Sequence, residues 1–240
     1  MVEPPPMTLS AVVAPLAVYA VVFQTLIYLS LPARLRTRFA PVVTGLVGAG
    51  LSIGAGVIFG FDEIGLIGAH PMTAVAWGMA AVILMTVIGI SMLSHHDLAS
   101  RLADPRLAGL SNGDAFKTIF VRIPVFTVLI EEAFFRGVLH AALMTLYPAD
   151  VAIWIGAGLF GLWHIGPGVD QAQAGQHRPR TNALHTALTV VATSVAGAFL
   201  VWLRIETGSI WASVAVHAAV NMTLAIFARL AARRRSVVAV

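Results

Sequence analysis

The chain is built around apolar segments that are each long enough to cross a bilayer as a helix, which takes about 20 residues. These segments begin near residues 9, 41, 71, 118, 151, 182 and 208. Of the 240 residues, 58% are hydrophobic and 11% are charged, whereas a soluble domain carries about 25% charged residues. A soluble fold could not cover so many apolar side chains with polar surface. We therefore predict an all-α, polytopic transmembrane helix bundle of about seven spans, with the functional site formed by the C-terminal helices.

The basic residues mark one side of this bundle. Most of the 15 Lys and Arg fall in alternate connections: Arg34, Arg36, Arg38, Arg101, Arg106, Lys117, Arg178, Arg180, Arg229, Arg233, Arg234 and Arg235. Because Lys and Arg concentrate on the cytoplasmic side of membrane proteins, this pattern predicts an outer N-terminus and a cytoplasmic C-terminus. The net charge of +4 then reflects topology, and no nucleic-acid partner is expected. The absence of Cys excludes disulfides, thiol nucleophiles and thiolate metal sites.

Two connections between predicted spans are long and polar. Residues 95–117 can hold a short helix at the membrane surface, with leucines as its apolar positions. Residues 166–181 are rich in Pro, Gly and Gln, which predicts a mobile loop.

Three charged residues stand inside the fourth apolar segment, namely Glu131, Glu132 and Arg136. An ionised side chain at membrane depth costs roughly 2.5–3.5 kcal/mol, so intramembrane charges mark functional sites by default. Glu132 and Arg136 are four residues apart and share a helix face, whereas Glu131 is turned about 100° away. We expect Glu132 to pair with Arg136 and Glu131, without a partner on its own helix, to be available as a general base. The alternative is a structural brace formed by all three residues.

Two further polar pairs lie four residues apart on other predicted helices. Phe160 and His164 belong to the fifth, and His217 and Asn221 to the seventh. A single histidine in a membrane helix is often a packing residue that makes one hydrogen bond. Polar faces on three separate helices of an otherwise apolar chain instead favour one shared site.

These residues form three motifs that resemble those of a known family. EEAFFR (Glu131–Arg136), FGLWH (Phe160–His164) and HAAVN (His217–Asn221) are similar, in order and spacing, to the EExxxR, FxxxH and HxxxN motifs of the CPBP intramembrane endopeptidases. That family includes the type II CAAX prenyl proteases and bacterial Abi-type immunity-associated proteins. The resemblance divides the chain into N-terminal helices with a cytoplasmic connection (1–117), a catalytic helix bundle (118–228) and a basic cytoplasmic tail (229–240).

The resemblance implies hydrolysis of a peptide bond, by activated water, in a membrane-anchored or lipidated CAAX-type substrate. It also implies a multi-pass protein of a bacterial plasma membrane. In this scheme Glu131 activates the water with help from His164, while His217 and Asn221 donate hydrogen bonds to the oxyanion. The supporting residues would be Glu132, Arg136 and Phe160.

The resemblance leaves the role of metal open, since the family has been described both as metalloproteases and as metal-independent glutamate proteases. Catalytic zinc favours three protein ligands and a water, and the candidates here are Glu131, His164 and His217. We favour a site without metal, because adjacent residues diverge on a helix and Glu132 is more simply used by Arg136. No other cofactor is expected.

Two other functions remain as alternatives. A proton-coupled transporter could use the same Glu and His residues as a relay, but the polar path would have to reach both membrane faces. The outer halves of most predicted helices are uninterrupted apolar sequence. A non-catalytic scaffold or immunity protein could sequester partners, although every motif residue is intact here.

Overall fold

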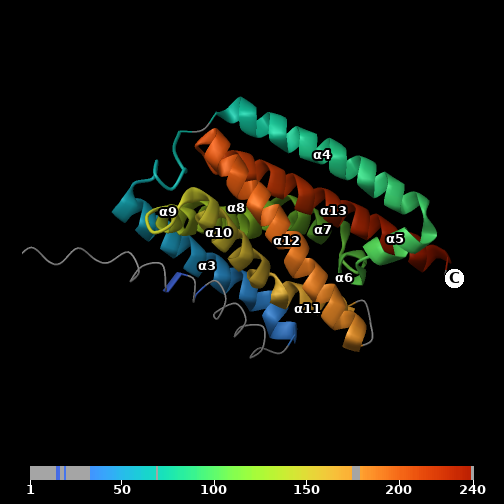
Figure 1. The fold of residues 1–240 in the computed structure, drawn as a ribbon. Coiled ribbons are helices and arrows are strands. Elements are labelled where there is room, and N and C mark those ends of the chain that lie inside the picture. The colour runs from blue at the N-terminus through green and yellow to red at the C-terminus, as the bar shows by residue number, and fades with distance from the viewer. Residues whose placement is uncertain (1–14, 17–18, 20–32, 69, 175–178, 239–240) are drawn as a thin grey trace, which may run out of the picture.

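A computed structural model describes residues 15–16, 19, 33–68, 70–174 and 179–238. All regular elements in this part of the chain are helices, and it contains no strand, which confirms the predicted all-α class. The long helices are α3 (Ala33–Phe59), α4 (Pro71–Ser94), α10 (Ala149–Trp163), α12 (Pro179–Thr207) and α13 (Trp211–Val238). They lie along one another in an elongated bundle, with α4 packed along α13 and α12 crossing in front (Figure 1).

The number of membrane spans is only partly settled by these helices. Within the described residues, four stretches are long and apolar enough to cross a membrane: Pro71–Ser94, Ala149–Val169, Ala183–Thr207 and Trp211–Arg234. They coincide with the predicted third, fifth, sixth and seventh spans. The apolar part of α3 is shorter, Gly45–Val57, and the predicted first span lies almost wholly outside the described residues. The total of seven therefore stays a prediction.

The surface of α4 is apolar on the side that faces away from α13. Met72, Val75, Ile83 and Leu84 are all strongly exposed there. Soluble monomers rarely expose a continuous apolar patch of this kind, because its contact with water is unfavourable. Lipid chains remove that penalty, so the chain is an integral membrane protein.

The polar connection after α4 folds into three short helices, α5 (His96–Leu102), α6 (Pro105–Ala108) and α7 (Asn112–Lys117). The predicted short helix is thus present, although it is divided. Arg229 of α13 donates hydrogen bonds to the carbonyl oxygens of Leu107 (2.8 Å) and Leu110 (2.9 Å). These bonds satisfy carbonyls at helix ends and fix the connection against α13.

The other polar connection differs from its prediction. Residues 166–174 are helical in α11 (Ile165–Ala174), which follows α10 after a break at His164. The predicted mobile loop is therefore wrong for this part, and residues 175–178 lie outside the described residues. Pro167 occurs in the first turn of α11, where a missing backbone N–H does not interrupt a helical hydrogen bond.

The basic connections gather at one end of the bundle. The start of α3, the helices α5 and α6 and the C-terminal end of α13 all lie at that end, whereas α9 (His140–Met144) and the turn before α4 lie at the other (Figure 1). This arrangement is the one that the positive-inside pattern requires. Which end faces the cytoplasm stays a prediction.

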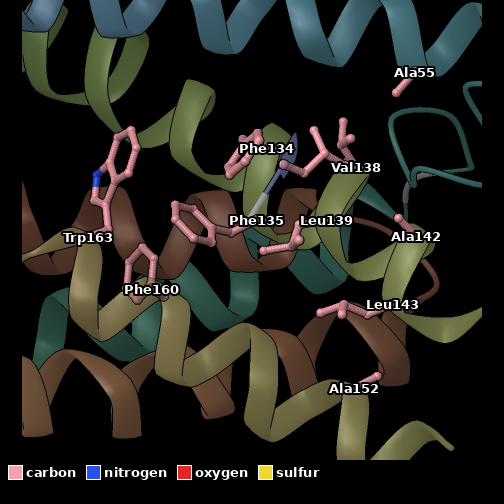
Figure 2. Packing of buried hydrophobic residues seen from close by; sticks show 11 residues of the cluster. Ala55, Phe134, Phe135, Val138, Leu139, Ala142, Leu143, Ala152, Phe160 and Trp163 are labelled. Atoms are coloured by element: carbon pink, nitrogen blue, oxygen red, sulfur yellow. The ribbon is translucent and has the colours of Figure 1, made fainter. Parts of the chain in front are cut away.

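An aromatic cluster fills the centre of the bundle beside the charged residues. Figure 2 shows Phe134 and Phe135 from one segment facing Phe160 and Trp163 from α10. The rings of Phe135 and Phe160 lie edge to face, with centroids 5.0 Å apart. Such pairs contribute about 0.5–1.5 kcal/mol beyond the area that they bury. The cluster therefore holds the segments that carry the first two motifs in a fixed relation.

Close approach of α10 and α12 depends on Gly161. A Cβ at this position would lie 2.7 Å from the carbonyl oxygen of Val190 and would collide with the side chain of Ser194. At Gly158, three residues earlier, an added Cβ meets nothing within 4 Å. We expect Gly161→Ala to destabilise the protein by about 1–3 kcal/mol through overpacking, while Gly158→Ala leaves it unchanged or slightly stabilised. Thermal unfolding in detergent measures both, and equal transition temperatures would contradict the expected contrast.

Candidate active site

The two adjacent glutamates lie on an irregular part of the predicted fourth helix. They end the short helix α8 (Leu129–Glu132), which is preceded by the π-helical segment η2 (Thr118–Val128) and followed by a second one, η3 (Ala133–Leu139). In η2 the N–H of Leu129 bonds to the carbonyl of Pro124, five residues earlier. π-Helical turns are rare and occur frequently at functional sites. The wider turns change which faces of the helix the flanking residues occupy.

Glu132 and Arg136 form the ion pair that their spacing predicts. Nη1 of Arg136 lies 3.0 Å from Oε1 of Glu132, and the two side chains are 1% and 0% exposed. Nη2 of Arg136 donates to the backbone carbonyl of Gly197 on α12, at 3.3 Å. Its guanidinium carbon lies 4.1 Å from the centre of the Phe160 ring, in cation–π contact. A buried charge pair needs such additional partners to offset its desolvation.

His217 joins the third motif to both glutamates. Its Nδ1 lies 2.7 Å from Oε1 of Glu132, and its Nε2 lies 3.9 Å from Oε2 of Glu131. A carboxylate can only accept a hydrogen bond, so Nδ1 carries the proton in the shorter contact. In an ideal helix Glu131 and Glu132 would point to different faces. Here both carboxylates face the same imidazole ring, each toward a different nitrogen.

Glu131 has a partner that the sequence did not reveal. Nε1 of Trp163 on α10 donates to Oε1 of Glu131 at 3.1 Å. Within FGLWH, Trp163 reads as one more apolar residue, and the only signal is that a buried tryptophan needs an acceptor for its N–H. Oε2 of Glu131 accepts no hydrogen bond from the described residues, and the side chain is 12% exposed. One oxygen is therefore held while the other faces His217.

His164 lies at the break between α10 and α11. Its Nδ1 is 2.8 Å from the carbonyl oxygen of Phe160, so Nδ1 donates and Nε2 has the lone pair in the neutral ring. The Phe160 ring neighbours both imidazoles, with centroid distances of 4.6 Å to His164 and 5.9 Å to His217. The three motifs thus converge on one small region.

Asn221, the fourth predicted catalytic residue, follows His217 by four residues on α13. Its side chain is half-buried, and the spacing places it on the same helix face as His217. Because α13 is a regular α-helix here, the spacing in the sequence is enough to place Asn221 on the same face as His217.

The same side chains meet only some requirements of a zinc site. The contacts from Nδ1 of His164 and His217 to a carbonyl and a carboxylate are of the kind that orients histidine ligands of zinc. The spacing does not fit, because no three His, Cys, Asp or Glu side chains in the described ranges lie close enough together to hold a metal ion. Glu132, the nearest additional carboxylate, is already bonded to Arg136 and His217. The residues in their observed positions therefore do not form a zinc site.

Comparison with known proteins gives one family. Residues 114–223 match the family model described as type II CAAX prenyl endopeptidase Rce1-like. No protein of curated function and no solved structure matches the chain. The matched residues include all three motifs and every residue of the convergent site, which confirms the resemblance noted in the sequence. Over residues 114–223 the chain is therefore similar to the CAAX-type (CPBP) membrane proteases, and this family implies a membrane-associated protein or peptide as substrate.

Proposed function

We propose that the protein is an intramembrane endopeptidase in which Glu131 activates a water molecule to hydrolyse a peptide bond. The observation that carries this proposal is the meeting of both glutamates of α8 with the two ring nitrogens of His217 from α13. The site thus contains the Glu131 carboxylate, which has one oxygen without a hydrogen bond, the His217 imidazole and the buried Glu132–Arg136 ion pair. Hydrolysis by water requires a base of this kind and a group that stabilises negative charge.

The attacking water would lie between Glu131 and the two histidines. The 3.9 Å separation of Glu131 Oε2 from His217 Nε2 is too long for a direct hydrogen bond and suits a bridging water. Nε2 of His164 supplies a second acceptor in the neutral ring. Glu131 takes a proton as the water oxygen bonds to the carbonyl carbon. When the C–N bond breaks, that proton passes to the departing amine, so the products are a carboxylic acid, which then ionises, and an amine.

His217 and Asn221 would stabilise the oxyanion that forms in this step. Because Nδ1 of His217 already donates to Glu132, Nε2 can donate only when the ring is doubly protonated. In that state the imidazolium and Arg136 together balance the charges of Glu131 and Glu132. A preorganised donor of this type contributes about 2.7–4 kcal/mol to transition-state stabilisation. Glu132, Arg136 and Phe160 hold His217 and the surrounding helices in place.

The proposed substrate is a membrane-anchored or lipidated, CAAX-type peptide. The family match and the depth of the site among apolar helices support this class. We also propose that the protein lies in a bacterial plasma membrane with its C-terminus in the cytoplasm, since the basic connections share one end of the bundle.

The test is cleavage of a lipidated CAAX-type peptide by the purified protein in bilayers prepared in ¹⁸O-labelled water. We expect one ¹⁸O atom in the new carboxyl group, measured by mass spectrometry. Cleavage without incorporated ¹⁸O would exclude direct attack by water. Peptide binding without cleavage would favour the scaffold alternative over the protease.

Metal dependence is tested separately by removal of metal. We expect turnover of the same peptide to be unchanged after incubation with a strong chelator followed by gel filtration, because no step uses a metal. The comparison is a mock-treated sample of the same preparation. Loss of activity that added Zn²⁺ restores would contradict this expectation and show that turnover depends on a metal.

A further inference from the structure

The indole N–H groups of Trp163 and Trp211 have different kinds of hydrogen-bond acceptor. Nε1 of Trp211 donates to the backbone carbonyl of Leu66 at 3.1 Å, which is an ordinary way to satisfy a buried N–H. Nε1 of Trp163 instead donates to Oε1 of Glu131, also at 3.1 Å. An ionisable side chain that faces the reaction site therefore takes the place of a backbone acceptor.

The Trp163 indole is held firmly by its neighbours. It is 4% exposed and lies in the aromatic cluster, with ring centroids 5.6 Å from Phe135, 6.4 Å from Phe134 and 5.9 Å from Tyr19. A tryptophan side chain has only two rotatable bonds, and close packing on several sides leaves little freedom about either. The direction of its N–H is thus set by the fold and not by Glu131.

The chemistry of an indole suits it to position a general base. Its N–H is a donor only and does not exchange a proton with a carboxylate, so it can orient Glu131 without competing for the proton of water. With Oε1 held by Trp163, Oε2 is the oxygen that faces Nε2 of His217. Trp163 also directly precedes His164 in the sequence. The turn at the end of α10 therefore positions His164 itself and, through Trp163, the carboxylate of Glu131.

We propose that Trp163 is a positioning residue for catalysis, which fixes the carboxylate of Glu131 so that Oε2 receives the proton of the attacking water. This inference rests on the proposed function, since it assigns a supporting residue to the same reaction. In this role Trp163 acts through Glu131, to which its Nε1 donates, and not by contact with the water or the peptide bond.

Replacement of Trp163 separates this role from simple packing. Trp163→Phe keeps an aromatic ring and removes the donor, and we expect kcat to fall about 10- to 100-fold with KM changed less than about twofold, as for loss of a hydrogen bond to a charged group. A second variant carries β-(3-benzothienyl)alanine at position 163, in which sulfur replaces the N–H without a change of shape. It should show the same loss. The matched control is Trp154→Phe, because Trp154 lies on the same helix and is 68% exposed, and it should keep wild-type kcat.

A spectroscopic measurement tests the contact without reference to turnover. The chain has five tryptophans, so a sample labelled with ¹⁵N in tryptophan gives few indole N–H resonances, and the Trp163→Phe spectrum assigns the one of interest. We expect Glu131→Gln to shift this resonance, because a neutral amide replaces the carboxylate acceptor, whereas Glu206→Gln at an exposed site should not.

The outcomes separate the two proposals. An inactive Glu131→Gln together with wild-type kcat for the benzothienyl variant would overturn the role of Trp163 and leave the general base in place. An indole resonance that does not respond to Glu131→Gln would also overturn it. Wild-type turnover of Glu131→Gln would remove the base, and with it any base for Trp163 to position. Reduced kcat in both Trp163 variants, with a shifted resonance, supports the inference.

Discussion

Glu131→Gln is expected to lower peptide turnover by about 10²–10⁴-fold, the usual contribution of a positioned general base. The amide has the shape of the carboxylate, and its oxygen can still accept the hydrogen bond from Trp163. The fold and substrate binding should therefore be retained, so the loss should appear in kcat and not in KM. The measurement is steady-state cleavage of a lipidated peptide in bilayers, accompanied by thermal unfolding of the same preparation.

The control for this substitution is Glu206→Gln, which makes the same chemical change at an exposed position near the end of α12. It should keep both turnover and unfolding temperature. A folded Glu131→Gln protein with turnover near that of the control would rule out Glu131 as the base. His164 and His217 would then be the remaining candidates, each through Nε2 of its neutral ring.

Arg136→Ala is expected to cause the largest loss of stability, about 3–5 kcal/mol, as is typical when one partner of a buried ion pair is removed. The substitution leaves the fully buried carboxylate of Glu132 without its guanidinium partner. It also removes the bond to Gly197 and the contact with Phe160. Expression, thermal unfolding in detergent and turnover should all decrease. Glu132→Gln should act in the same direction, because it removes the carboxylate that pairs directly with the buried guanidinium.

Two further variants separate stability from chemistry. In the double variant Glu132→Leu/Arg136→Met, apolar residues replace both charges, so much of the lost stability should return. Activity should remain low, because Nδ1 of His217 has lost its acceptor. Arg106→Ala removes a partly exposed ion pair with Asp104 and should cost less than about 1 kcal/mol. If Arg136→Ala is as mild as Arg106→Ala, the buried pair does not hold the site together.

Local spacing was enough to predict one part of the site. The apolar segments, the pairing of Glu132 with Arg136 and the shared face of His217 and Asn221 follow from composition and from the helical repeat of 3.6 residues. The three motifs also predicted the family that the comparison of residues 114–223 confirms. Each of these features depends on residues that are close in the sequence, where the backbone alone fixes their relation.

Other features depend on contacts between helices that are far apart in the sequence. The π-helical turns around α8, the continuation of residues 166–174 as a helix and the bond from Trp163 to Glu131 have no separate signal in the sequence. The same holds for His217, whose two ring nitrogens face both carboxylates across 85 residues of chain. The sequence by itself determined which residues could do the chemistry and which of them share a face of the same helix. The tertiary structure decided which atoms meet, because packing of side chains between helices, and not the helical repeat, sets how far each helix is rotated and displaced against the next.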